Sequence, residues 1–475
     1  MNRDLKPVTK ILAAGFIAGG MKKAYNYPGF FSHELFAQLG EHSIQLSEKH
    51  TFAEAFGSSL AGKRTVVTFK NVGLNVAADA YLHSVIAGVN AGLVLVIFDD
   101  IDVWGSQESQ DSRHFLDFYG GLLLEPSNLQ DAYSFARHSF RMSEEYNVPV
   151  VIRITNAHLN IKDKEIDTIT SDTSDRKKIV KGMKSSFIVH PYYWHDQYKA
   201  LQLKNQQIVN SAEFTVAVQK PKNKELVIVF GAADNLISKL PSASTNYDVI
   251  RVYQLPIHSS LLKTIIYKSY ESVYILEYGQ SYLWEKISAN LLVPTHSIVP
   301  SIMDNAKQFK PWNLDGNLFE AIQKLKESDE IFVVSDITRS TVEKHQVVDA
   351  ALSYGSALSV SCGFAKAKLE NEKVICIAGD GSATHEGLDT INYAHRNNLQ
   401  LTLIIVDNGG LWCTGGQAAA LNIHEYLKQH FLPFKHIDIN HDKTQHIASV
   451  IQSSLKNIGF SIILAKTDMG TLRNE

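Results

Sequence analysis

Two apolar runs that each end in polar residues constrain this sequence more than any other feature. The first run covers residues 373–378 and stops at Gly379-Asp380-Gly381, and a helical pattern follows it. The second run covers residues 401–406 and stops at Asp407-Asn408. Two parallel strands joined by a helix end at the same edge of a sheet. We therefore expect Asp380 and Asn408 to lie side by side at the edge where open α/β sheets bind ligands.

The two strand tips combine oxygen donors with flexible glycine backbone. Mg²⁺ prefers oxygen ligands and is commonly shared between a protein carboxylate and substrate phosphates. Glycine lets the backbone approach phosphate oxygens, and the N-terminus of the following helix favours their negative charge. Asp380 and Asn408 are therefore predicted to hold Mg²⁺ against a diphosphate. The simpler alternative is a structural strand-to-helix turn, because a lone Gly-Asp-Gly occurs in many doubly wound folds.

The composition is that of an ordinary globular protein, with 45% hydrophobic and 20% charged residues. A length of 475 residues is enough for about three domains. The net charge of −3 favours neither nucleic acid nor a membrane surface as a partner. No apolar run is long enough to span a membrane, and the N-terminus shows no signal-peptide pattern, so we expect a cytoplasmic enzyme.

The three cysteines, Cys362, Cys376 and Cys413, lie far apart, and no Cys-x-x-Cys occurs. Buried, reduced thiols are the expected state in an intracellular protein. A cubane iron–sulfur cluster needs a set of suitably spaced thiolates. We therefore predict that this chain holds no iron–sulfur cluster on its own ligands.

Strand and helix patterns alternate along most of the chain, which favours parallel sheets covered by helices on both faces. We predict an α/β protein of three doubly wound parallel-sheet domains, at residues 1–160, 223–325 and 326–475. Residues 161–222 are polar and charged, and we predict a linker or a surface wrap there. The strands expected in the first domain are 64–69, 92–98 and 149–154, those in the second are 226–230, 249–253 and 273–277, and one at 331–334 leads into the third.

Several motifs carry a resemblance to a known enzyme family. The Gly-Asp-Gly segment followed by Asn408 resembles the signature of thiamine diphosphate enzymes, and residues 414–417 resemble the 2-oxoacid:ferredoxin oxidoreductases. The resemblance implies a pyrimidine-binding domain, a middle domain like the C-terminal domain of transketolase, and a domain that binds the diphosphate and Mg²⁺. The segments that resemble the α subunit of indolepyruvate ferredoxin oxidoreductase are residues 57–79, 99–100, 106–113 and 125–127.

In this family one glutamate contacts N1′ of the aminopyrimidine and so drives deprotonation of the thiazolium ring. It stands at a fixed distance before a Gly-Ala/Ser-Ser segment, and counting back from Gly57 leads to Glu48. The resemblance therefore implies that Glu48 is the catalytic glutamate. Two alternatives remain. Glu48 could be a solvated residue at a helix entry, or Glu54 could take the role from a different face of the helix.

The resemblance also implies the remaining contacts of cofactor and substrate. Gly410 offers its main-chain carbonyl as a third ligand of the metal, beside the two strand-tip residues. His385 faces the diphosphate or the substrate, and capping of a helix N-terminus is the alternative. Arg113 orients the substrate carboxylate, with a structural Asp111–Arg113 pair as an equal alternative. Further cofactor contacts are expected at Tyr27, Gly355, Ser356, Gly379, Asp380, Gly381, Ser382, Cys413 and Thr414.

Three features depart from the family pattern. The family's α subunit continues into a ferredoxin-like domain with two clusters, which we expect this chain to lack, because its sequence stops at Glu475. A family threonine that could bond the 2-oxo acid corresponds to Phe30, which has no hydrogen-bonding side chain. A family histidine near the cofactor corresponds to Asn71. These changes indicate a rebuilt substrate pocket beside a retained cofactor site.

We therefore expect an enzyme that uses thiamine diphosphate and Mg²⁺ on a 2-oxo acid without oxidising it, by decarboxylation, carboligation or both. The resemblance and the residues Phe30, Phe31 and Trp412 favour an aromatic substrate. One alternative is an indolepyruvate or 2-oxoacid ferredoxin oxidoreductase subunit whose clusters lie on a partner chain. Another is a non-catalytic relative kept for binding or assembly. A homodimer is expected by analogy, and a small second subunit is left open.

Overall fold

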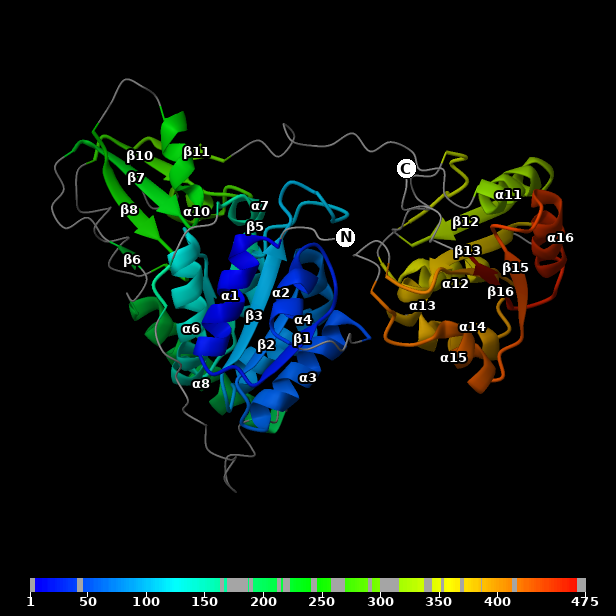
Figure 1. The fold of residues 1–475 in the computed structure, drawn as a ribbon, viewed down its shortest axis with the longest axis horizontal. Helices are drawn as coiled ribbons and strands as arrows, with labels where there is room; N and C mark the ends of the chain where they lie inside the picture. The colour runs from blue at the N-terminus through cyan, green and yellow to red at the C-terminus, as the bar shows by residue number, and fades with distance from the viewer. Residues whose placement is uncertain are drawn as a thin grey trace. The chain divides into compact units, whose positions relative to one another are not determined.

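The computed structural model of the chain divides into two compact units, Met1–Ala306 and Lys307–Glu475. They contain three largely parallel β-sheets of six, five and five strands with flanking helices, as the sequence predicts (Figure 1). No helix among the residues described is long and apolar enough to cross a membrane. The structure describes residues 5–40, 46–162, 166–168, 187, 191–211, 215–216, 223–240, 246–257, 270–288, 293–299, 316–336, 344–351, 354–367, 371–385, 387–411 and 417–467.

The first sheet of unit 1 has the strand order β1-β2-β3-β5-β4-β9. Neighbouring strands are parallel except for the pair β4 and β9 at one edge. The strand β3 is apolar and fully buried along its length, as expected where helices cover both faces of a parallel sheet. The three predicted strands are confirmed with a shift of one residue. The strands are β1 Lys23–Asn26, β2 Thr65–Lys70, β3 Leu93–Asp99, β4 Leu122–Leu124, β5 Val150–Thr155 and β9 Gln254–Leu255.

Helices α3 (Glu48–Leu60) and α4 (Asn71–Ala87) pack against each other and against β2. The helix α4 follows β2 directly, and α3 ends just before β2 begins. Both helices therefore start at the carboxyl edge of the sheet, where folds of this type bind ligands. The other helices of unit 1 are α1 Pro7–Ala18, α2 Ser32–Gln38, α5 Arg113–Tyr119, α6 Leu129–Tyr146, α7 Asn156–Leu159, α8 Pro191–Asn210 and α10 Tyr282–Ser288.

The second sheet of unit 1 has the strand order β11-β10-β7-β8-β6. Its strands are parallel except for β6 against β8. The three strands predicted for the middle domain are confirmed to within one residue. The strands are β6 Thr215–Val216, β7 Glu225–Phe230, β8 Asp248–Val252, β10 Ser272–Leu276 and β11 Thr295–Ile298, and a 3₁₀ helix, η2, covers Ala233–Lys239.

Part of the segment predicted as a linker, residues 161–222, is a packed helix. Helix α8 lies against α4 and α6, and its Ile208 is fully buried. The polar composition of this segment conceals the contact, because a helix needs only a narrow apolar stripe to dock on others. Most of the remaining residues of the predicted linker lie outside the described part of the chain.

Lys204 of helix α8 is a buried lysine whose replacement should stabilise the fold. Burial lowers its pKa from 10.5 to about 8. Between these two pH values the folded chain has released the proton of Lys204 but the unfolded chain still holds it. The free energy of unfolding therefore increases as the pH rises from about 8 to 10.5. Below pH 8 the folded protein bears the full cost of burying the charged ammonium group, about 3 kcal/mol. Lys204→Met should therefore raise the urea-unfolding midpoint at pH 7, and the gain should shrink by pH 10.

Lys199 provides the matched control, because it lies on the same helix and is exposed. Lys199→Met removes the same charge from solvent and should change the free energy of unfolding by less than about 0.5 kcal/mol. Equal shifts in the two variants, or a gain for Lys204→Met that does not depend on pH, would contradict the assignment of a desolvated ammonium group.

The sheet of unit 2 is entirely parallel, with the strand order β12-β13-β14-β16-β15. The two apolar runs on which the sequence argument rests are the neighbouring strands β13 and β14. Helix α11 belongs to this unit, so the domain boundary predicted at residue 326 falls inside it and is placed too late. The elements are β12 Ile331–Ser335, β13 Lys373–Gly379, β14 Thr402–Asp407, β15 Phe434–Asp438, β16 Ser461–Lys466, α11 Gly316–Ser328, α12 Ala357–Ala367, α14 Leu388–Arg396, α15 Ile423–Gln429 and α16 Thr444–Leu455.

Two separate cores cover the faces of this sheet. Cys376 and Leu403 point to one face, where they pack with residues of α12, α14 and α15. Ile377 and Ile404 point to the other face and pack with residues of α11 and α16. The alternation follows from the two-residue period of a strand. Cys362 and Cys376 are buried free thiols, as predicted.

Candidate active site

Strand β13 passes into a short helix, α13 (Asp380–His385), without an intervening loop. Ser382 stabilises the turn at this junction. Its hydroxyl accepts a hydrogen bond from the Gly379 N–H at 2.9 Å and donates one to the Gly379 carbonyl at 3.1 Å. A Cβ atom at Gly381 would collide with Leu411. The Gly-Asp-Gly segment is therefore a tight junction that fixes Asp380 at the edge of the sheet.

Three oxygen-bearing groups converge at the tips of β13 and β14. The strands are parallel neighbours, with Gly379 opposite Val406 in the ladder. One end of the Asn408 side-chain amide lies 3.2 Å from Asp380 Oδ1 and 2.7 Å from the Gly410 carbonyl oxygen. The expectation that Asp380 and Asn408 lie side by side is therefore confirmed, and the main chain of Gly410 joins them.

The geometry of these three groups fits a magnesium ion. Mg²⁺ holds oxygen ligands at about 2.0–2.1 Å in an octahedron, so neighbouring ligand oxygens lie about 2.9 Å apart. The Asn408 amide has two orientations. In one, its NH₂ group donates to Asp380 and Gly410; in the other, its oxygen faces both of these acceptors. The second orientation is favourable only when a cation lies among the oxygens. Rotation of the Asn408 amide therefore converts a site whose groups are hydrogen-bonded to one another into a site that can bind a cation.

The carboxyl group of Asp380 is buried, so its ionisation is energetically unfavourable without a cation nearby. Burial, with a smaller contribution from the negative charge of Asp407, raises the pKa of Asp380 to about 6. Main-chain N–H groups of Gly381, Gly410 and Gly409 oppose this shift by donating to the carboxylate. A divalent cation would favour the ionised form in the same way. In the described part of the chain no three His, Cys, Asp or Glu side chains form a metal site, so this mixed set of donors is the candidate.

Asp336 organises the neighbouring strand tip, although the sequence did not single it out. It follows β12 and is 1% exposed, and its carboxylate accepts a hydrogen bond from the Ala357 N–H at 2.9 Å. Burial raises the pKa of Asp336, while hydrogen bonds from Ala357, Ser382 and Gly355 lower it. These bonds bring the start of α12, with Gly355 and Ser356, to the Gly-Asp-Gly turn. An aspartate two positions after the end of the apolar run 331–334 is the signal that could have identified it.

His385 ends α13 and is buried, and its ring meets Tyr354 edge-on with 5.1 Å between the ring centroids. The next helix, α14, has Gly387 as its N-cap and no side-chain cap. Both interpretations of His385, contact with the diphosphate or substrate and capping of a helix N-terminus, stay predictions. The predicted cofactor residues Cys413 and Thr414 lie outside the described residues.

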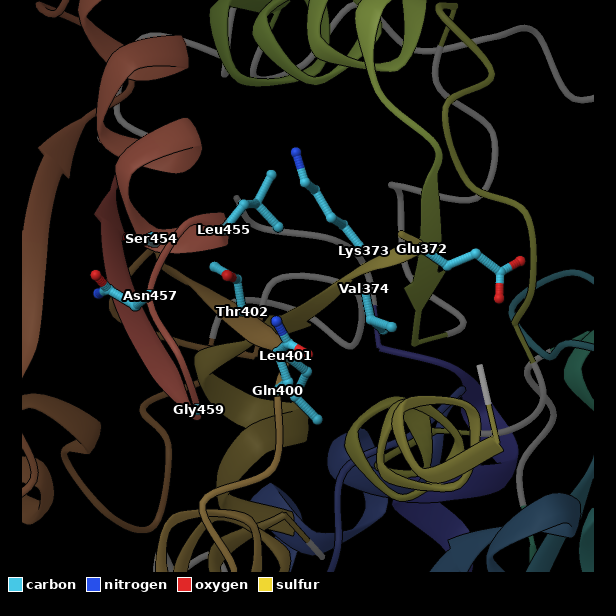
Figure 2. A pocket seen from close by; sticks show the side chains of 10 residues that line it. All are labelled: Glu372, Lys373, Val374, Gln400, Leu401, Thr402, Ser454, Leu455, Asn457 and Gly459. Carbon is cyan, nitrogen blue, oxygen red and sulfur yellow. The ribbon is translucent and has the colours of Figure 1, made fainter. Parts of the chain in front are cut away.

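Figure 2 shows a small crevice in unit 2 at the opposite edge of the sheet. Lys373 and Thr402, at the starts of β13 and β14, line it. Its inner space of about 10 Å³ has room for a single water molecule. The carboxyl edge holds Asp380 and Asn408, so the crevice is not part of the candidate site.

Glu48 is the first residue of α3 and is 5% exposed. Its side chain lies against the first turn of α4, since a Cβ atom at Gly73 would come within 2.7 Å of Glu48 Oε1. Glu54 is partly exposed and pairs with His50 at 2.9 Å. The structure therefore excludes a solvated Glu48 and leaves Glu48, rather than Glu54, as the buried carboxylate at the carboxyl edge of the first sheet. Its contact with the aminopyrimidine stays a prediction.

Gly73 gives a test of how tightly this carboxylate is placed. The Cβ atom of Gly73→Ala would lie 2.7 Å from both Cγ and Oε1 of Glu48. These atoms belong to a side chain, so the carboxylate should move while the helix stays, with a stability change within about 1 kcal/mol. If Glu48 acts on the cofactor, turnover should fall at least about tenfold, because a small displacement of a catalytic group is costly. Steady-state kinetics and urea unfolding measure the two effects.

The control for this variant is Gly57→Ala, because a Cβ atom there meets nothing within 4 Å. Gly57 lies inside α3, so alanine should stabilise the fold by about 0.5–1 kcal/mol and leave turnover unchanged. A Gly73→Ala variant with wild-type turnover would show that the position of Glu48 does not matter for the reaction.

Arg113 is fully buried and is engaged on every nitrogen. Nε donates to Asp111 Oδ1 at 2.8 Å, and Nη1 donates to Glu277 Oε2 at 2.6 Å. Nη2 donates to the main-chain oxygens of Tyr278 at 3.0 Å and Gln280 at 2.9 Å. The prediction that Arg113 orients a substrate carboxylate is corrected, because the guanidinium is shielded and committed to protein oxygens. The alternative, a structural Asp111–Arg113 pair, describes its role.

Arg153 completes a buried ion cluster with Arg113. It pairs with Asp99 and with Glu125 Oε2, the latter at 2.6 Å, and both of its partners are fully buried. Burial raises the pKa of Asp99, Glu125 and Glu277, and the nearby guanidinium groups lower it. Burial would also raise the pKa of Asp111, but the two guanidinium groups hold it below its usual range.

This ion cluster connects the two sheets of unit 1. Glu277 follows β10, whereas Arg153 lies in β5 of the first sheet. Gly231 and Gly279, which follow β7 and β10, have positive φ values and leave space for the cluster, since Cβ atoms there would collide with Glu125 and Asp111. The carboxyl ends of β3, β4 and β5 are therefore covered. The tips of β1 and β2 are left as the candidate ligand-binding half of this edge, and the predicted cofactor residue Tyr27, which is buried, directly follows β1 there.

Residues 336–451 match the family model described as the thiamine pyrophosphate enzyme C-terminal TPP binding domain. This segment begins at Asp336 and includes the whole oxygen-bearing tip of β13 and β14. An indolepyruvate oxidoreductase subunit, IorA, from Methanothermobacter thermautotrophicus is 23% identical over 95% of this chain and 84% of its own. The IorA subunit from Pyrococcus horikoshii is 24% identical over 87% of this chain and 76% of its own.

Among solved structures, 2-oxoglutarate:ferredoxin oxidoreductase from Magnetococcus marinus is 12% identical over 62% of this chain and 61% of its own, with a TM-score of 0.49. The sequence relatives, in contrast, align along most of both chains. The chain is thus a divergent relative, along most of its length, of the indolepyruvate oxidoreductase subunits named IorA, and its residues 336–451 match a thiamine pyrophosphate-binding domain.

Proposed function

We propose that this chain is the thiamine diphosphate-binding subunit of an oxidoreductase that acts on 2-oxo acids. The observation that carries the proposal is the convergence of Asp380, Asn408 and Gly410 inside the segment that matches the thiamine pyrophosphate-binding domain. Thiamine diphosphate, when bound, supplies an electron sink for breaking the bond between a carboxylate and a carbonyl carbon. The names of the relatives favour oxidation over the decarboxylation or carboligation that the sequence predicts.

The residues of the chain have separate roles in this proposal. Asp380, Asn408 and the Gly410 carbonyl would hold Mg²⁺, whose charge would offset that of the diphosphate. Glu48 would share a proton with N1′ of the aminopyrimidine, and its burial beside Gly73 keeps it away from water. His385 lies at the end of the helix that starts with Asp380, and in this proposal it would contact the diphosphate or the substrate.

The proposed reaction needs a second electron carrier. The C1–C2 bond of the 2-oxo acid breaks and CO₂ leaves, the acyl group passes to a thiol with loss of its proton, and two electrons remain to be removed. The three cysteines of the chain form no Cys-x-x-Cys, so we propose that a partner polypeptide with one-electron centres accepts the electrons one at a time. A homodimer of this chain within such an assembly stays a prediction.

An assay of the purified chain tests the proposal. The chain is mixed with thiamine diphosphate, Mg²⁺ and an aryl pyruvate, and CO₂ release is followed with and without a one-electron dye and a thiol. Release that requires the dye supports the oxidoreductase. Release without any acceptor would support the decarboxylase or carboligase instead. A chain that fails to bind the cofactor at all, by calorimetry, would refute both enzymes and leave the non-catalytic relative.

A further inference from the structure

Three backbone segments of unit 2 meet just beyond the tip of strand β12. The strand ends at Ser335, and the next main-chain N–H, that of Asp336, donates to the Ile377 carbonyl of β13 at 3.2 Å. This bond lies three positions before Asp380 in the chain. The third segment, residues 354–357, leads into helix α12. Asp336 therefore lies where the tip of β12, the end of β13 and the start of α12 come together.

The side chain of Asp336 joins the start of α12 to the Gly-Asp-Gly turn. Its carboxylate accepts from the Ala357 N–H at 2.9 Å and from the main chain of Gly355. It also accepts from the hydroxyl of Ser382, in the first turn of α13. Because Asp336 is 1% exposed, water is not at hand to replace these bonds. The carboxylate is thus a buried link between the starts of two helices.

The same two segments also touch through side chains. The ring of Tyr354 meets the ring of His385, at the other end of α13, edge-on. A Cβ atom at Gly381 would lie 3.0 Å from the Tyr354 hydroxyl oxygen and would collide with Leu411. Tyr354 therefore lies against the turn that carries Asp380. A shift of residues 354–357 would move this turn, because close-packed protein interiors transmit strain.

We propose that Asp336 is a positioning residue for the magnesium site. It fixes the turn of residues 379–382 relative to α12, so that Asp380 meets Asn408 and the Gly410 carbonyl. Asp336 is not one of these three donors and acts on them through the turn. This inference rests on the proposed function and adds a residue that supports the donors from behind. Metal ligands depend on such partners, because the partners set the orientation of the ligand groups.

The test is calorimetric binding of thiamine diphosphate and Mg²⁺ to the full chain. Asp336→Asn keeps the size of the side chain, but its NH₂ group has to face a donor to which the carboxylate offers an oxygen. Cofactor affinity should fall about 10- to 100-fold, as for other residues that orient metal ligands. In the Asp380→Ala background the same substitution should change affinity less than about threefold, because the group that Asp336 positions is already lost. A purely structural role would give equal effects in both backgrounds.

A second variant leaves the carboxylate in place. Ala357 is the first residue of α12, a position that suits proline, and Ala357→Pro removes the N–H that donates to Asp336. Loss of this one hydrogen bond should lower cofactor affinity about 3- to 10-fold. Urea unfolding verifies that both variants fold. If Asp336→Asn does not fold, wild-type affinity in Ala357→Pro overturns the proposal.

The matched control is Asp438→Asn. Asp438 ends β15 on the same edge of the same sheet, and its carboxylate accepts from the N–H groups of Asn440 and His441. This variant should keep cofactor affinity within about threefold of wild type. Wild-type affinity in Asp336→Asn, or equal losses in the two backgrounds, would overturn the role of Asp336 alone. A wild-type chain that does not bind the cofactor would instead refute the proposed function.

Discussion

Replacing Asp380 with alanine should lower Mg²⁺-dependent binding of thiamine diphosphate at least about 100-fold. The carboxylate is one of three oxygen donors that converge within 3.2 Å at the tips of β13 and β14. Mg²⁺ depends on oxygen ligands in a defined geometry, and loss of the only anionic donor of the three leaves two neutral ligands. Even outer-shell changes at metal sites cost about 10- to 100-fold in affinity, so a direct ligand should cost at least that much. Calorimetric titration of the cofactor with Mg²⁺ or with EDTA measures the loss.

Two variants separate metal binding from a general effect of charge. Asp407→Asn removes a neighbouring carboxylate that is not one of the three donors, and it should leave cofactor affinity within about threefold. Asn408→Asp keeps the oxygen but sets two carboxylates about 3 Å apart, which is unfavourable without a cation. The melting temperature of this variant should fall in EDTA and recover in Mg²⁺. Asp380→Ala with wild-type, Mg²⁺-dependent affinity would place the ion elsewhere.

The strand tips could be predicted because their signals are local. An apolar run that stops at Gly-Asp-Gly, and a second that stops at Asp-Asn, determine both the pairing of the strands and the edge on which the polar groups lie. The family resemblance pointed to Glu48 through its distance from Gly57, but it left Glu54 as an alternative. The burial of Glu48 against Gly73, which excludes the solvated alternative, comes from the packing of α3 on α4 and has no local signal.

The role of Arg113 could not be predicted from the sequence. Asp111 is two positions away and was recognised as a partner, but Glu277 is 164 positions away and follows a strand of another sheet. A segment that is distant in the sequence determines whether an arginine contacts substrate or is buried against protein. The residues around the arginine do not indicate whether such a segment packs on it. The sequence of the cofactor site also does not predict whether the reaction is an oxidation, because the same kind of site serves oxidative and non-oxidative reactions.

Arg153→Met should destabilise unit 1 by about 3–5 kcal/mol at pH 8, because it leaves buried carboxylates without their counter-charge. The guanidinium of Arg153 lies within 2.6 Å of Glu125 Oε2 and also pairs with Asp99, and all three side chains are fully buried. Methionine fills a similar volume but supplies no donor. The exposed pair of Arg141 and Glu145, one helical turn apart, provides the matched control, and Arg141→Met should cost less than about 0.5 kcal/mol. Urea unfolding at constant pH gives both values.

The pH dependence of Arg153→Met identifies the cause of this loss. Burial already raises the pKa of Asp99 and of Glu125, and the charge of Arg153 opposes that shift. Without Arg153 both pKa values rise further, so the folded variant holds protons that the unfolded chain releases, and its stability falls as the pH rises. The deficit against wild type should therefore be larger at pH 8 than at pH 5. Adding Glu125→Gln should restore part of the stability at pH 8, since it removes one unpaired charge. A deficit that is independent of pH and of Glu125 would mean that lost packing, and not uncompensated charge, is what the arginine prevents.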